Sequence, residues 1–572
     1  MPYIKKLVMR GFKSFASETE IPFQNSMNVI VGPNGSGKSS CYDTRVLLSD
    51  GMEIEIGKLV EDKILASNSL KKLDDGIYTD SDNSTEIISL NIKTMKCEKK
   101  KISKFIKRKG DIVYKIKTRT GKEVKATGCH PVIAFKDGSI RSTTINELTK
   151  KDLIATPRIL SLGNEKDYDV DLARLIGYII GDGYIAKDRI EFINNDSEVI
   201  EDFKSIIVNK FKLDFRERLD KNIRRIYIRD KNFVAFIRNL FVKNCKDSIT
   251  SSVKKVPDEM MNISKIGITN ILQGLFDTDG SVRKDIGIIE YCTKNKNLAC
   301  QIQGLLLRFG IISKIKKRAC CASNTDKKLK RDYYYLYVYG KENIEKFYSN
   351  ISLKVKHKRE NIESYLAKNL NSNTNIDILP KEVNLMIKNL CSALGIKIKP
   401  LKKEYPFLLA YIENRCSPTR VGVGKLMPLF FEKFSKLQGF YSGIKLNQSY
   451  LVSSLKELNI SGQEASKQIG LHPSIIMRDW ATNKFKAKTQ NLNKFYAFIN
   501  NSLAERLGMA ERIIVLLKTI SQSDIFWDEL VSVEVLGREE FVYDLEIEDN
   551  HNFIANNLFV HNSNIADAIC FV

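Results

Sequence analysis

Histidine is scarce in this chain of 572 residues, and long apolar runs are missing. The chain has five His, and we find no run of about 18 uncharged apolar residues, the length that a membrane-spanning helix requires. The N-terminus carries Lys5, Lys6 and Arg10 without a sustained apolar segment behind them, unlike an export signal. We therefore expect neither a membrane span nor export.

The 11 cysteines also lack the spacing of a cysteine-based framework. They are scattered along the chain and form no CxxC pair. This pattern indicates neither a zinc site nor a set of disulfides. A reducing compartment fits these cysteines, and we expect a cytoplasmic location.

Basic residues are in clear excess. The chain has 92 Lys plus Arg against 68 Asp plus Glu, a formal charge of +24, and basic runs occur at residues 314–318 (KIKKR) and 327–331 (KKLKR). The excess points to a polyanionic partner, with nucleic acid as the leading candidate. For any single run, solvated surface lysine is an equally good explanation. The length allows about three or four domains.

A phosphate-binding loop near the N-terminus breaks off before its helix. Residues 31–40 read VGPNGSGKSS, a GxxxxGKS pattern whose backbone N–H groups, lysine and serine hydroxyl hold a nucleotide phosphate and Mg²⁺ when a helix follows. The residues of this candidate nucleotide site are Gly32, Gly35, Gly37, Lys38 and Ser39. Instead of a helix, residues 41–51 (CYDTRVLLSDG) predict a strand and an Asp-Gly turn.

The missing helix is found at the other end of the chain. Residues 563–572 (SNIADAICFV) have the small and apolar residues expected after a phosphate loop. Together with GFKSF and VGPNGSGKS in residues 1–40, they resemble the N-terminal ATP-binding segment of structural-maintenance-of-chromosomes ATPases. The resemblance implies an ATP- and Mg²⁺-dependent, nucleoid-associated host protein, whose own partners bind only after the two segments are joined.

The 522 residues between these segments (562 − 41 + 1) resemble an intein, a self-splicing protein insert. The resemblance rests on CYDTRVLLSDG at residues 41–51, ATGCHPV at 126–132 and VYDLEIEDNHNFIANNLFVHN at 542–562. Each motif alone has an ordinary structural explanation. The complete set, in order and across a split host motif, favours splicing.

The intein family assigns the first steps of splicing to four residues. Cys41 attacks the carbonyl carbon of Ser40 and turns the peptide bond into a thioester, since a thiolate is the best nucleophile among side chains at neutral pH. Thr127 polarises the scissile amide and His130 protonates its departing nitrogen. Ser563 then accepts the upstream segment on its hydroxyl.

The last step belongs to the C-terminal end of the insert. Asn562 closes its side-chain amide onto its own carbonyl, and the five-membered ring makes this reaction intramolecular. The resemblance assigns His561 to polarise that carbonyl, His551 to assist, and Asp544 to position or activate the nucleophiles. No cofactor is implied for splicing.

An internal repeat lies in the middle of the insert. Residues 175–183 (LIGYIIGDG) and 272–280 (LQGLFDTDG) align position for position. They resemble the two motif helices of LAGLIDADG homing endonucleases, which pack through small residues, here Gly177, Gly181, Gly274 and Thr278. A pair of apolar helices ending in Asp-Gly turns is the plain structural alternative.

The nuclease resemblance implies a metal site over DNA. Asp182 and Asp279 would lie side by side and bind Mg²⁺, which activates water for phosphodiester hydrolysis. Lys254 stands where this family usually has an active-site lysine, and Lys255 is the alternative. Residues 189–195, 224–230, 287–293 and 333–340 predict strands that form a saddle on double-stranded DNA, namely the intein-free allele of the host gene.

Residues from about 361 to 520 predict a basic, helical region. Within it, residues 461–484 resemble a helix-turn-helix, with Gly470 at the turn and apolar contacts from Ala465, Ile469, Leu471, Ile475 and Trp480. A plain helical hairpin is nearly as good an interpretation. A DNA-reading module would suit a nuclease with one long target site.

We therefore predict a multidomain intein-containing precursor: an all-β, horseshoe-shaped splicing (Hint) domain interrupted by an α/β endonuclease and a mainly helical DNA-binding insert. The predicted boundaries are 1–40 (host), 41–168 (splicing), 169–360 (endonuclease), 361–520 (helical), 521–562 (splicing) and 563–572 (host). Two rivals are a phosphate-loop ATPase with an interaction insert and one with a catalytically dead, DNA-binding insert. The first does not explain Cys at the first position of the insert and His-Asn-Ser across its end, and only an assay separates the second from an active insert.

Overall fold

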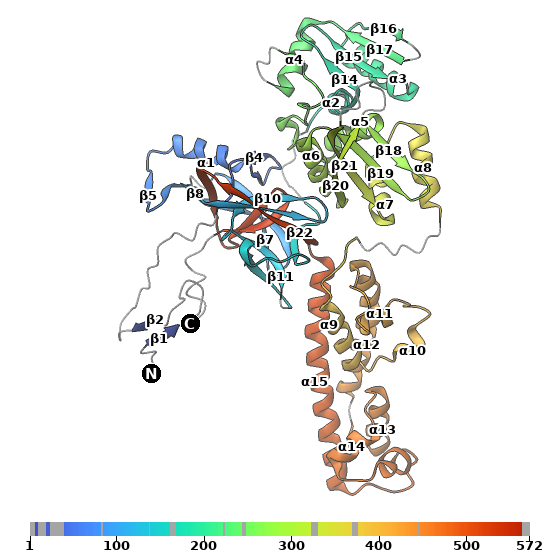
Figure 1. Cartoon of the computed structure of the whole chain (residues 1–572). Coiled ribbons are helices and arrows are strands. Elements are labelled where there is room, and N and C mark those ends of the chain that lie inside the picture. Colours follow the sequence, from blue (N-terminus) through green and yellow to red (C-terminus); the bar gives the residue numbers. More distant parts are fainter. Residues whose placement is uncertain are drawn as a thin grey trace.

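A computed structural model of the chain describes residues 6–9, 19–22, 39–81, 84–136, 138–160, 167–220, 223–242, 247–321, 330–368, 376–443 and 445–562. Three units follow one another in it (Figure 1): a β-rich unit at the left, an α/β unit at the upper right and a helical unit below. The β-rich unit is discontinuous, because α15 (Thr489–Gln522) returns the chain to it after the other two units. The described part of the first host segment forms a two-stranded sheet of β1 (Lys6–Met9) and β2 (Thr19–Pro22).

The β-rich unit contains two antiparallel sheets built from both ends of the insert. The larger sheet runs β10 (Glu123–Thr127), β9 (Ile112–Thr118), β22 (Ile525–Arg538), β13 (Leu153–Pro157), β11 (Pro131–Lys136), β25 (Leu558–His561), β24 (Asn552–Ala555), β3 (Arg45–Leu47) and β4 (Glu53–Glu55), with β12 (Ser139–Thr144) paired to β11. The smaller sheet runs β23 (Phe541–Ile547), β8 (Lys96–Lys109), β6 (Gly76–Asp80) and β5 (Lys71–Leu73), with β7 (Glu86–Asn91) paired to β8. The predicted β-rich splicing unit from two chain segments is thereby confirmed.

The strands are interrupted by two short helices, so the unit is not purely β. These are α1 (Ile56–Leu65) and the 3₁₀ turn η1 (Ile145–Glu147). In α1, Ile56, Leu59, Val60 and Ile64 recur at helical spacing, and all four are buried against the β-rich core. The all-β prediction for this unit missed the helix, whereas the strand and Asp-Gly turn predicted for residues 41–51 correspond to β3 and the turn before β4.

The α/β unit consists of two halves with the same order of elements. The first half contains α2 (Val170–Asp182), β14 (Gly183–Ile185), β15 (Ile190–Asn194), α3 (Ser197–Ser205), the π-helical turn η2 (Ile206–Lys210), β16 (Arg216–Asp220), β17 (Ile223–Ile228) and α4 (Lys231–Phe241). After η3 (Asp258–Met260), the second contains α5 (Lys265–Thr278), β18 (Gly280–Arg283), β19 (Ile288–Thr293), α6 (Lys296–Leu307), β20 (Ser313–Cys321), β21 (Lys330–Tyr339), α7 (Lys341–Asn350) and α8 (Lys356–Leu366). The sheets have equivalent orders, β14-β15-β17-β16 and β18-β19-β21-β20. The predicted internal repeat is confirmed.

The two repeat helices, α2 and α5, contact each other through glycine. A Cβ atom on Gly177 would lie 2.9 Å from the Cα of Gly274, and one on Gly181 would lie 2.0 Å from the Thr278 hydroxyl. Such distances exclude a larger side chain, so the backbones approach closely. The small-residue contact predicted from the repeat is confirmed. Both helices begin at side-chain caps, Asp169 for α2 and Ser264 for α5.

The helical unit contains α9 (Val383–Ala393), α10 (Ile398–Leu401), α11 (Leu408–Ile412), α12 (Arg420–Ser442), α13 (Gln448–Glu457), α14 (Gly462–Ile469), the π-helical segment η4 (Ile475–Trp480) and α15. The candidate helix-turn-helix corresponds to α14, the turn and η4. Gly470 takes a left-handed conformation (φ 77°) at the end of α14, as a helix-terminating glycine does. Ala465, Ile469 and Trp480 are buried, but Leu471 and Ile475 are half-buried, and Ile476 is buried instead because the π-helix shifts the inward face by one residue.

The helical unit is fixed to the β-rich unit by a buried arginine. The guanidinium of Arg420 contacts the Asp377 carboxylate at 3.0 Å and donates to the carbonyls of Ile525, at 2.6 Å, and Ile520. Arg158, which follows β13, contacts Asp377 as well. The cation and anion satisfy each other in a region closed to water, which ties α12 and α15 to β22.

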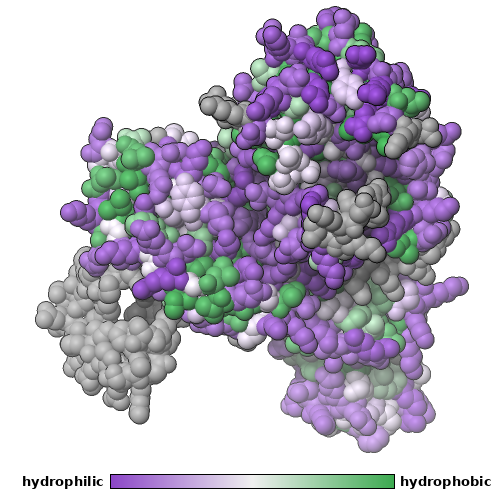
Figure 2. All heavy atoms as spheres, turned by 45° about the horizontal axis from the view of Figure 1, so that its top comes forward, coloured by the Kyte–Doolittle hydropathy of each residue, from purple (hydrophilic) through white to green (hydrophobic). Residues whose placement is uncertain are grey.

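The surface is largely polar. Figure 2 shows hydrophilic residues over most of the visible face, with apolar side chains in small separate patches. No helix within the described ranges is long and apolar enough to cross a membrane, and α15, at 34 residues, carries charges along its length.

The glycine contact between α2 and α5 generates a stability prediction. A Cβ on Gly274 would lie 2.5 Å from the carbonyl oxygen of Arg174, so Gly274→Ala should push the helices apart and destabilise the chain by about 1–3 kcal/mol. Gly424→Ala in α12 is the control: nothing lies within 4 Å of its Cβ position, and alanine should stabilise this exposed helix position by up to about 1 kcal/mol. Urea unfolding measures both, and equal stability of the two variants would contradict the close packing.

Candidate functional site

The upstream junction, Ser40–Cys41, lies along the free edge of β10. Cys41 N–H donates to the carbonyl of Lys125 (3.1 Å), and Ser40 exchanges two backbone hydrogen bonds with Tyr543 of β23, at 2.8 and 2.9 Å. The scissile carbonyl, that of Ser40, thus accepts a hydrogen bond from the Tyr543 N–H. Both residues of the junction are buried. The edge of β10 and the start of β23 therefore hold the scissile peptide in an extended conformation.

The predicted Thr127 and His130 flank this junction. Thr127 N–H donates to the Ser39 carbonyl (2.9 Å), and its Oγ1 accepts from the Ser39 N–H (3.1 Å). His130 N–H donates to the carbonyl of Thr127 (2.9 Å), so the two residues form one turn, and the His130 ring is fully buried. The structure brings both beside the upstream junction.

Cys41 is buried among acidic groups. Burial raises the pKa of its thiol to about 12; the carboxylates of Glu539 and Asp43 add to the rise, and the ammonium of Lys125 opposes it. At neutral pH the group is therefore a thiol, not the thiolate that the sequence argument assumed. Burial and neighbouring charge are invisible in a sequence motif, and the thiol proton must be removed as the sulfur attacks.

The downstream end of the insert lies on the β24–β25 hairpin. His561 Nδ1 is 2.6 Å from the carbonyl oxygen of Asn562, so the tautomer with a proton on Nδ1 donates a hydrogen bond to this carbonyl. Asn562 is buried, and its Nδ2 and Oδ1 have no hydrogen-bond partner among the described residues. The amide nitrogen is thus not engaged elsewhere.

His551 and Asp544 complete the predicted set. The carbonyl of His551 accepts the Asn562 N–H (2.8 Å), and its φ of 52° turns the chain into β24. Asp544 is buried on β23, next to Tyr543, and accepts from the Leu545 N–H (2.8 Å). His551 is therefore bonded directly to the downstream junction residue, and Asp544 follows the residue that is bonded to Ser40 at the upstream junction.

The turn containing Thr127 and His130 lies between the two junctions. β11 and β25 are antiparallel with Val132 opposite Val560. Continued by two residues, this register brings His130 toward Asn562, while Thr127 is bonded to Ser39. The two chain ends of the insert therefore converge on one turn. Ser563 and the phosphate-loop residues Gly32, Gly35, Gly37 and Lys38 lie outside the described residues; Ser39 is described and buried.

The second predicted site lies at the ends of the repeat helices. Asp182 is the last residue of α2, and Asp279 caps α5. Burial raises the pKa of both carboxyls, that of Asp279 to about 7, and the charge of Asp182 contributes to the latter. Asp182 also accepts from Asn194 Nδ2 (2.7 Å). Two buried carboxylates that repel each other suit a shared divalent cation, which would remove the repulsion.

Each helix end is also covered by a lysine. Lys254 Nζ donates to the carbonyls of Ile179 (2.9 Å) and Gly183 (2.7 Å), and burial lowers its pKa to about 8. Lys358 Nζ does the same at α5, donating to the carbonyls of Phe276 and Asp277 at 2.9 and 2.6 Å.

The structure therefore places Lys254, not Lys255, beside the carboxylates. Lys255 instead pairs with Asp258 at 2.8 Å, away from the helix ends. The sequence reasoning missed Lys358. The internal repeat is the signal that could have found it, since an equivalent of Lys254 was to be expected after the second motif.

The predicted saddle strands are confirmed as β15, β17, β19 and β21, and the outer strands β16 and β20 extend both sheets. On one face of the second sheet, three basic residues of β20 lie opposite three tyrosines of β21: Lys314 with Tyr337, Lys316 with Tyr335, and Arg318 with Tyr333. The buried Leu336 and Val338 point to the other face. Arg318 stacks 5.3 Å from the ring centre of Tyr335. Cations interleaved with aromatic rings are typical of surfaces that contact nucleic acid.

The burial of Cys41 predicts slow and strongly pH-dependent alkylation. Between pH 7 and 9, reaction of Cys41 with iodoacetamide should rise about tenfold per pH unit without levelling, because the thiolate fraction grows by that factor below the pKa. Exposed Cys129 is the internal control and should react faster. Glu539→Gln should accelerate Cys41 severalfold, since it removes a carboxylate that raises the pKa. Peptide mass spectrometry reads both sites; equal rates at Cys41 and Cys129 would contradict the burial.

Known proteins resemble this chain over almost its whole length. The chain is 24% identical, over 633 aligned residues, to the replication factor C small subunit of Methanocaldococcus jannaschii; the match covers 98% of this chain and 32% of that protein. It spans 32% to 64% of the first curated relatives it matches.

Solved structures cover smaller parts of the chain. The PabCDC21-1 intein is 30% identical over 22% of this chain and 74% of its own, with a TM-score of 0.20. The homing endonuclease I-DmoI, in its mesophilic variants, is 14% identical over 32% of this chain and 96% of its own, with a TM-score of 0.24.

The match that identifies the chain is to a protein-family model. The model described as "Intein splicing domain" matches residues 46–562, which begin within β3, five residues after Cys41, and end at Asn562. This chain belongs to the intein splicing domain family.

Proposed function

We propose that the chain splices itself, excising residues 41–562 and joining the segments on either side. The observation that carries this proposal is the convergence of both junctions on the Thr127–His130 turn, with the His561 ring against the Asn562 carbonyl. The proposed splicing domain is the horseshoe-shaped Hint fold. Its chemistry needs only groups that the chain supplies.

The geometry supports an ordered reaction. Cys41 Sγ attacks the carbonyl carbon of Ser40, the amide nitrogen leaves with a proton from His130, and the upstream segment becomes a thioester. The Ser563 hydroxyl then takes over the acyl group and frees the thiol. Asn562 Nδ2 attacks its own carbonyl carbon, which breaks the bond to Ser563. An oxygen-to-nitrogen shift finally joins Ser40 to Ser563 by a peptide bond.

Buried groups explain how these steps stay confined to the junctions. A protonated Cys41 thiol is unreactive until a base accepts its proton, and buried Asp544 beside Tyr543 is our candidate for that role. At the other end, a hydrogen bond from His561 withdraws electrons from the Asn562 carbonyl as negative charge develops on its oxygen. Water has little access to either carbonyl, since Ser40, Cys41 and Asn562 are buried.

Splicing predicts two defined products from the full chain: a 522-residue excised protein (562 − 41 + 1) and a 50-residue ligated one (40 + 10). Cys41→Ala should block upstream cleavage and ligation, because no thioester can form. Asn562→Ala should still form the thioester, so an added thiol should release residues 1–40. Mass spectrometry under reducing, near-neutral conditions identifies each product, and a folded wild-type chain that stays intact would contradict self-splicing.

His130 can be tested in the same experiment. In the Asn562→Ala background, His130→Ala should slow thiol-induced release roughly 10²–10⁴-fold, since the amide nitrogen then leaves unprotonated. His472→Ala is the matched control, because the ring of this exposed histidine bonds only Ser474 among the described residues and lies in the helical unit. Equal release from the two variants would remove His130 from the mechanism.

We further propose that the α/β unit is a LAGLIDADG-type nuclease that cuts the intein-free allele of the host gene. The paired Asp182 and Asp279 carboxylates would hold Mg²⁺, which supplies a Lewis acid and an activated water when bound. Lys254 and Lys358 are held within the same helix-end region, where their charge can stabilise a scissile phosphate. The cationic and aromatic faces of the two sheets would contact the DNA backbone, and the helical unit would add contacts from α14 and η4.

We propose a structural-maintenance-of-chromosomes ATPase as the host. The support is the GFKSF and VGPNGSGKS stretches of residues 1–40 together with NIADAICFV at the C-terminal end. Joining them would restore an ATP- and Mg²⁺-binding loop, after which the host's own partners could bind. The curated relative named above is a different protein, a replication factor C small subunit, and the match covers 32% of it.

The nuclease proposal predicts Mg²⁺-dependent linearisation of a plasmid that carries the uninterrupted loop sequence. Asp182→Asn and Asp279→Asn should each abolish double-strand cleavage, whereas Lys254→Ala and Lys358→Ala should slow it. Asp285→Asn, an exposed carboxylate near the same sheet, is the control. Binding should weaken steeply with salt. Persistent supercoiled plasmid, despite tight and salt-sensitive binding, would indicate a decayed nuclease.

A further inference from the structure

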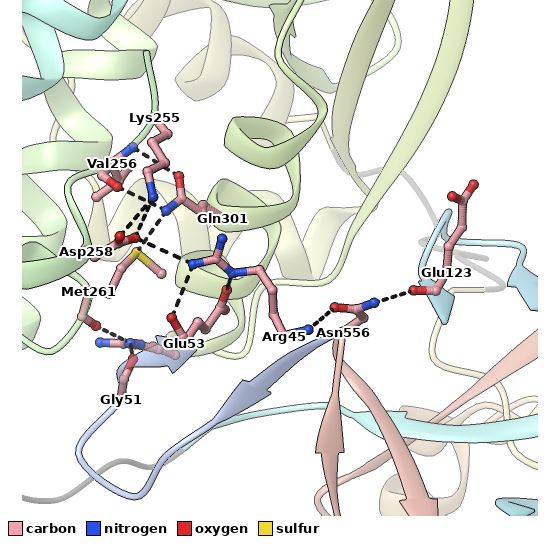
Figure 3. A network of polar contacts seen from close by, with 11 residues as sticks. Arg45, Gly51, Glu53, Glu123, Lys255, Val256, Asp258, Met261, Gln301 and Asn556 are labelled. Carbon is pink, nitrogen blue, oxygen red and sulfur yellow. Dashed lines mark hydrogen bonds and ion pairs between the residues drawn. The ribbon is translucent and has the colours of Figure 1, made fainter. Parts of the chain in front are cut away.

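The hydrogen-bonding edge of β10 is completed by a side chain. Along this edge, Thr127 N–H bonds the Ser39 carbonyl and the Lys125 carbonyl bonds Cys41 N–H. The chain then turns away, with Thr44 N–H bonded to the Cys41 carbonyl (3.1 Å). The carbonyl of Glu123, the next residue whose backbone faces this edge, accepts a hydrogen bond from the side chain of Asn556 (Nδ2, 3.0 Å). Figure 3 shows this side chain between Glu123 and Arg45.

Asn556 also bonds the backbone at the start of β3, the first strand after Cys41. Its Oδ1 accepts the Arg45 N–H (2.9 Å), and its own N–H donates to the Arg45 carbonyl (2.8 Å). Arg45 is the first residue of β3, four residues after Cys41. One asparagine therefore bonds both β10, which carries the junction, and β3, which receives the chain after it.

The same residue belongs to the hairpin of the downstream junction. Asn556 and Asn557 form the turn between β24 and β25, with φ of 47° and 61°. Two left-handed residues in succession are typical of a tight hairpin turn. β25 then runs directly to His561 and Asn562. The turn thus links the segment after Cys41 to the strand that ends at Asn562.

We infer that Asn556 is a positioning residue for splicing, which holds the two junctions in register so that the acyl group on Cys41 passes to the downstream nucleophile. The inference rests on the proposed splicing function. Without this clamp each junction can still react alone: water hydrolyses the thioester, giving residues 1–40 with a free carboxylate, and Asn562 cyclisation releases the downstream segment. The clamp therefore governs how products are partitioned more than the rate of either half-reaction.

The contacts specify an amide at position 556. Asparagine offers one acceptor to Arg45 N–H and one donor to the Glu123 carbonyl; aspartate keeps the acceptor but places an oxygen against that carbonyl. The guanidinium of Arg45 does not take part. It points to the other side, 3.6 Å from Glu53 and 3.5 Å from Asp258 (Figure 3).

Neighbouring Asn557 provides a matched control. It shares the left-handed backbone, but its side chain makes no hydrogen bond to any of the described residues. Glycine accepts positive φ without strain, so Asn556→Gly and Asn557→Gly each remove one side chain and preserve the turn. Asn556→Asp serves as a second variant that retains the side chain's size.

The test is mass spectrometry of the full chain, with wild type and the three variants compared at equal fractions folded, as measured by circular dichroism. We expect the ratio of ligated to singly cleaved product to fall roughly tenfold in Asn556→Asp, which loses one hydrogen bond, and at least as far in Asn556→Gly, which loses two. Asn557→Gly should match wild type. Thiol-induced release of residues 1–40, in an Asn562→Ala background, should change less than about threefold, because the β10 contacts of the junction remain.

Two results would overturn the clamp: a wild-type product ratio in Asn556→Gly, or an equal shift in Asn557→Gly, which would show a general effect of the turn. Parallel loss of all products, including thiol release, would show that Asn556 supports the fold and not the register. A wild-type chain that yields no product would overturn the splicing function itself, and the clamp with it.

Discussion

Backbone pairing between the two ends of the insert is the interaction on which the rest of this structure depends. β22, β23 and β25 come from the last 40 or so residues before Asn562, yet they pair with β9, β13, β8 and β11 from the first part. Ser40 itself bridges Ala126 and Tyr543. The two junctions come together only when these strands pair, because Ser40 is bonded to Tyr543 of β23 and Asn562 directly follows β25. The long intervening chain is tolerated since the entropy of closing a loop grows only with the logarithm of its length.

Burial sets the chemistry at both candidate sites. It raises the pKa of Cys41 and of Asp279, and it lowers that of Lys254. In each case burial favours the neutral form of the group (thiol, carboxylic acid or amine), as expected where water is excluded. A buried thiol resists premature reaction, and a pair of buried carboxylates gains most from a cation that neutralises them. The same physical cost therefore keeps the Cys41 thiol protonated and raises the pKa of the carboxyl groups at the ends of α2 and α5.

The β-rich and α/β units share more than a covalent connection. Arg308 of the α/β unit donates to the Gly51 carbonyl (2.8 Å), Gln303 to that of Thr120 (3.3 Å), and Ile315 N–H to the same carbonyl (2.9 Å). Arg45 contacts Asp258 from the other side (Figure 3). These contacts orient the α/β unit on the sheet that carries the upstream junction. Asn556 lies next to this interface, because Arg45 bonds Asn556 through its backbone and contacts Asp258 through its side chain.

The sequence by itself determined the order of the motifs and the repeat. Cys41, the TxxH segment and His561-Asn562 could be recognised because chemistry demands those residue types, and the alignment of the two glycine-acid motifs predicted α2 and α5 with their close contact. Local pattern also predicted the four inner saddle strands. The sequence pattern did not predict α1 or the π-helical turn at η4. In η4 the π-helix buries Ile476 in place of the expected Ile475.

Only the tertiary structure decided what those residues can do. The protonation of Cys41, the choice of Lys254 over Lys255, the role of Lys358 and the three hydrogen bonds of Asn556 depend on groups tens to hundreds of residues away. A sequence pattern records residue type and spacing along the chain. Burial, charge and hydrogen bonding depend on which distant strands and helices come together, and for this chain that assembly is decided by the pairing of its two ends.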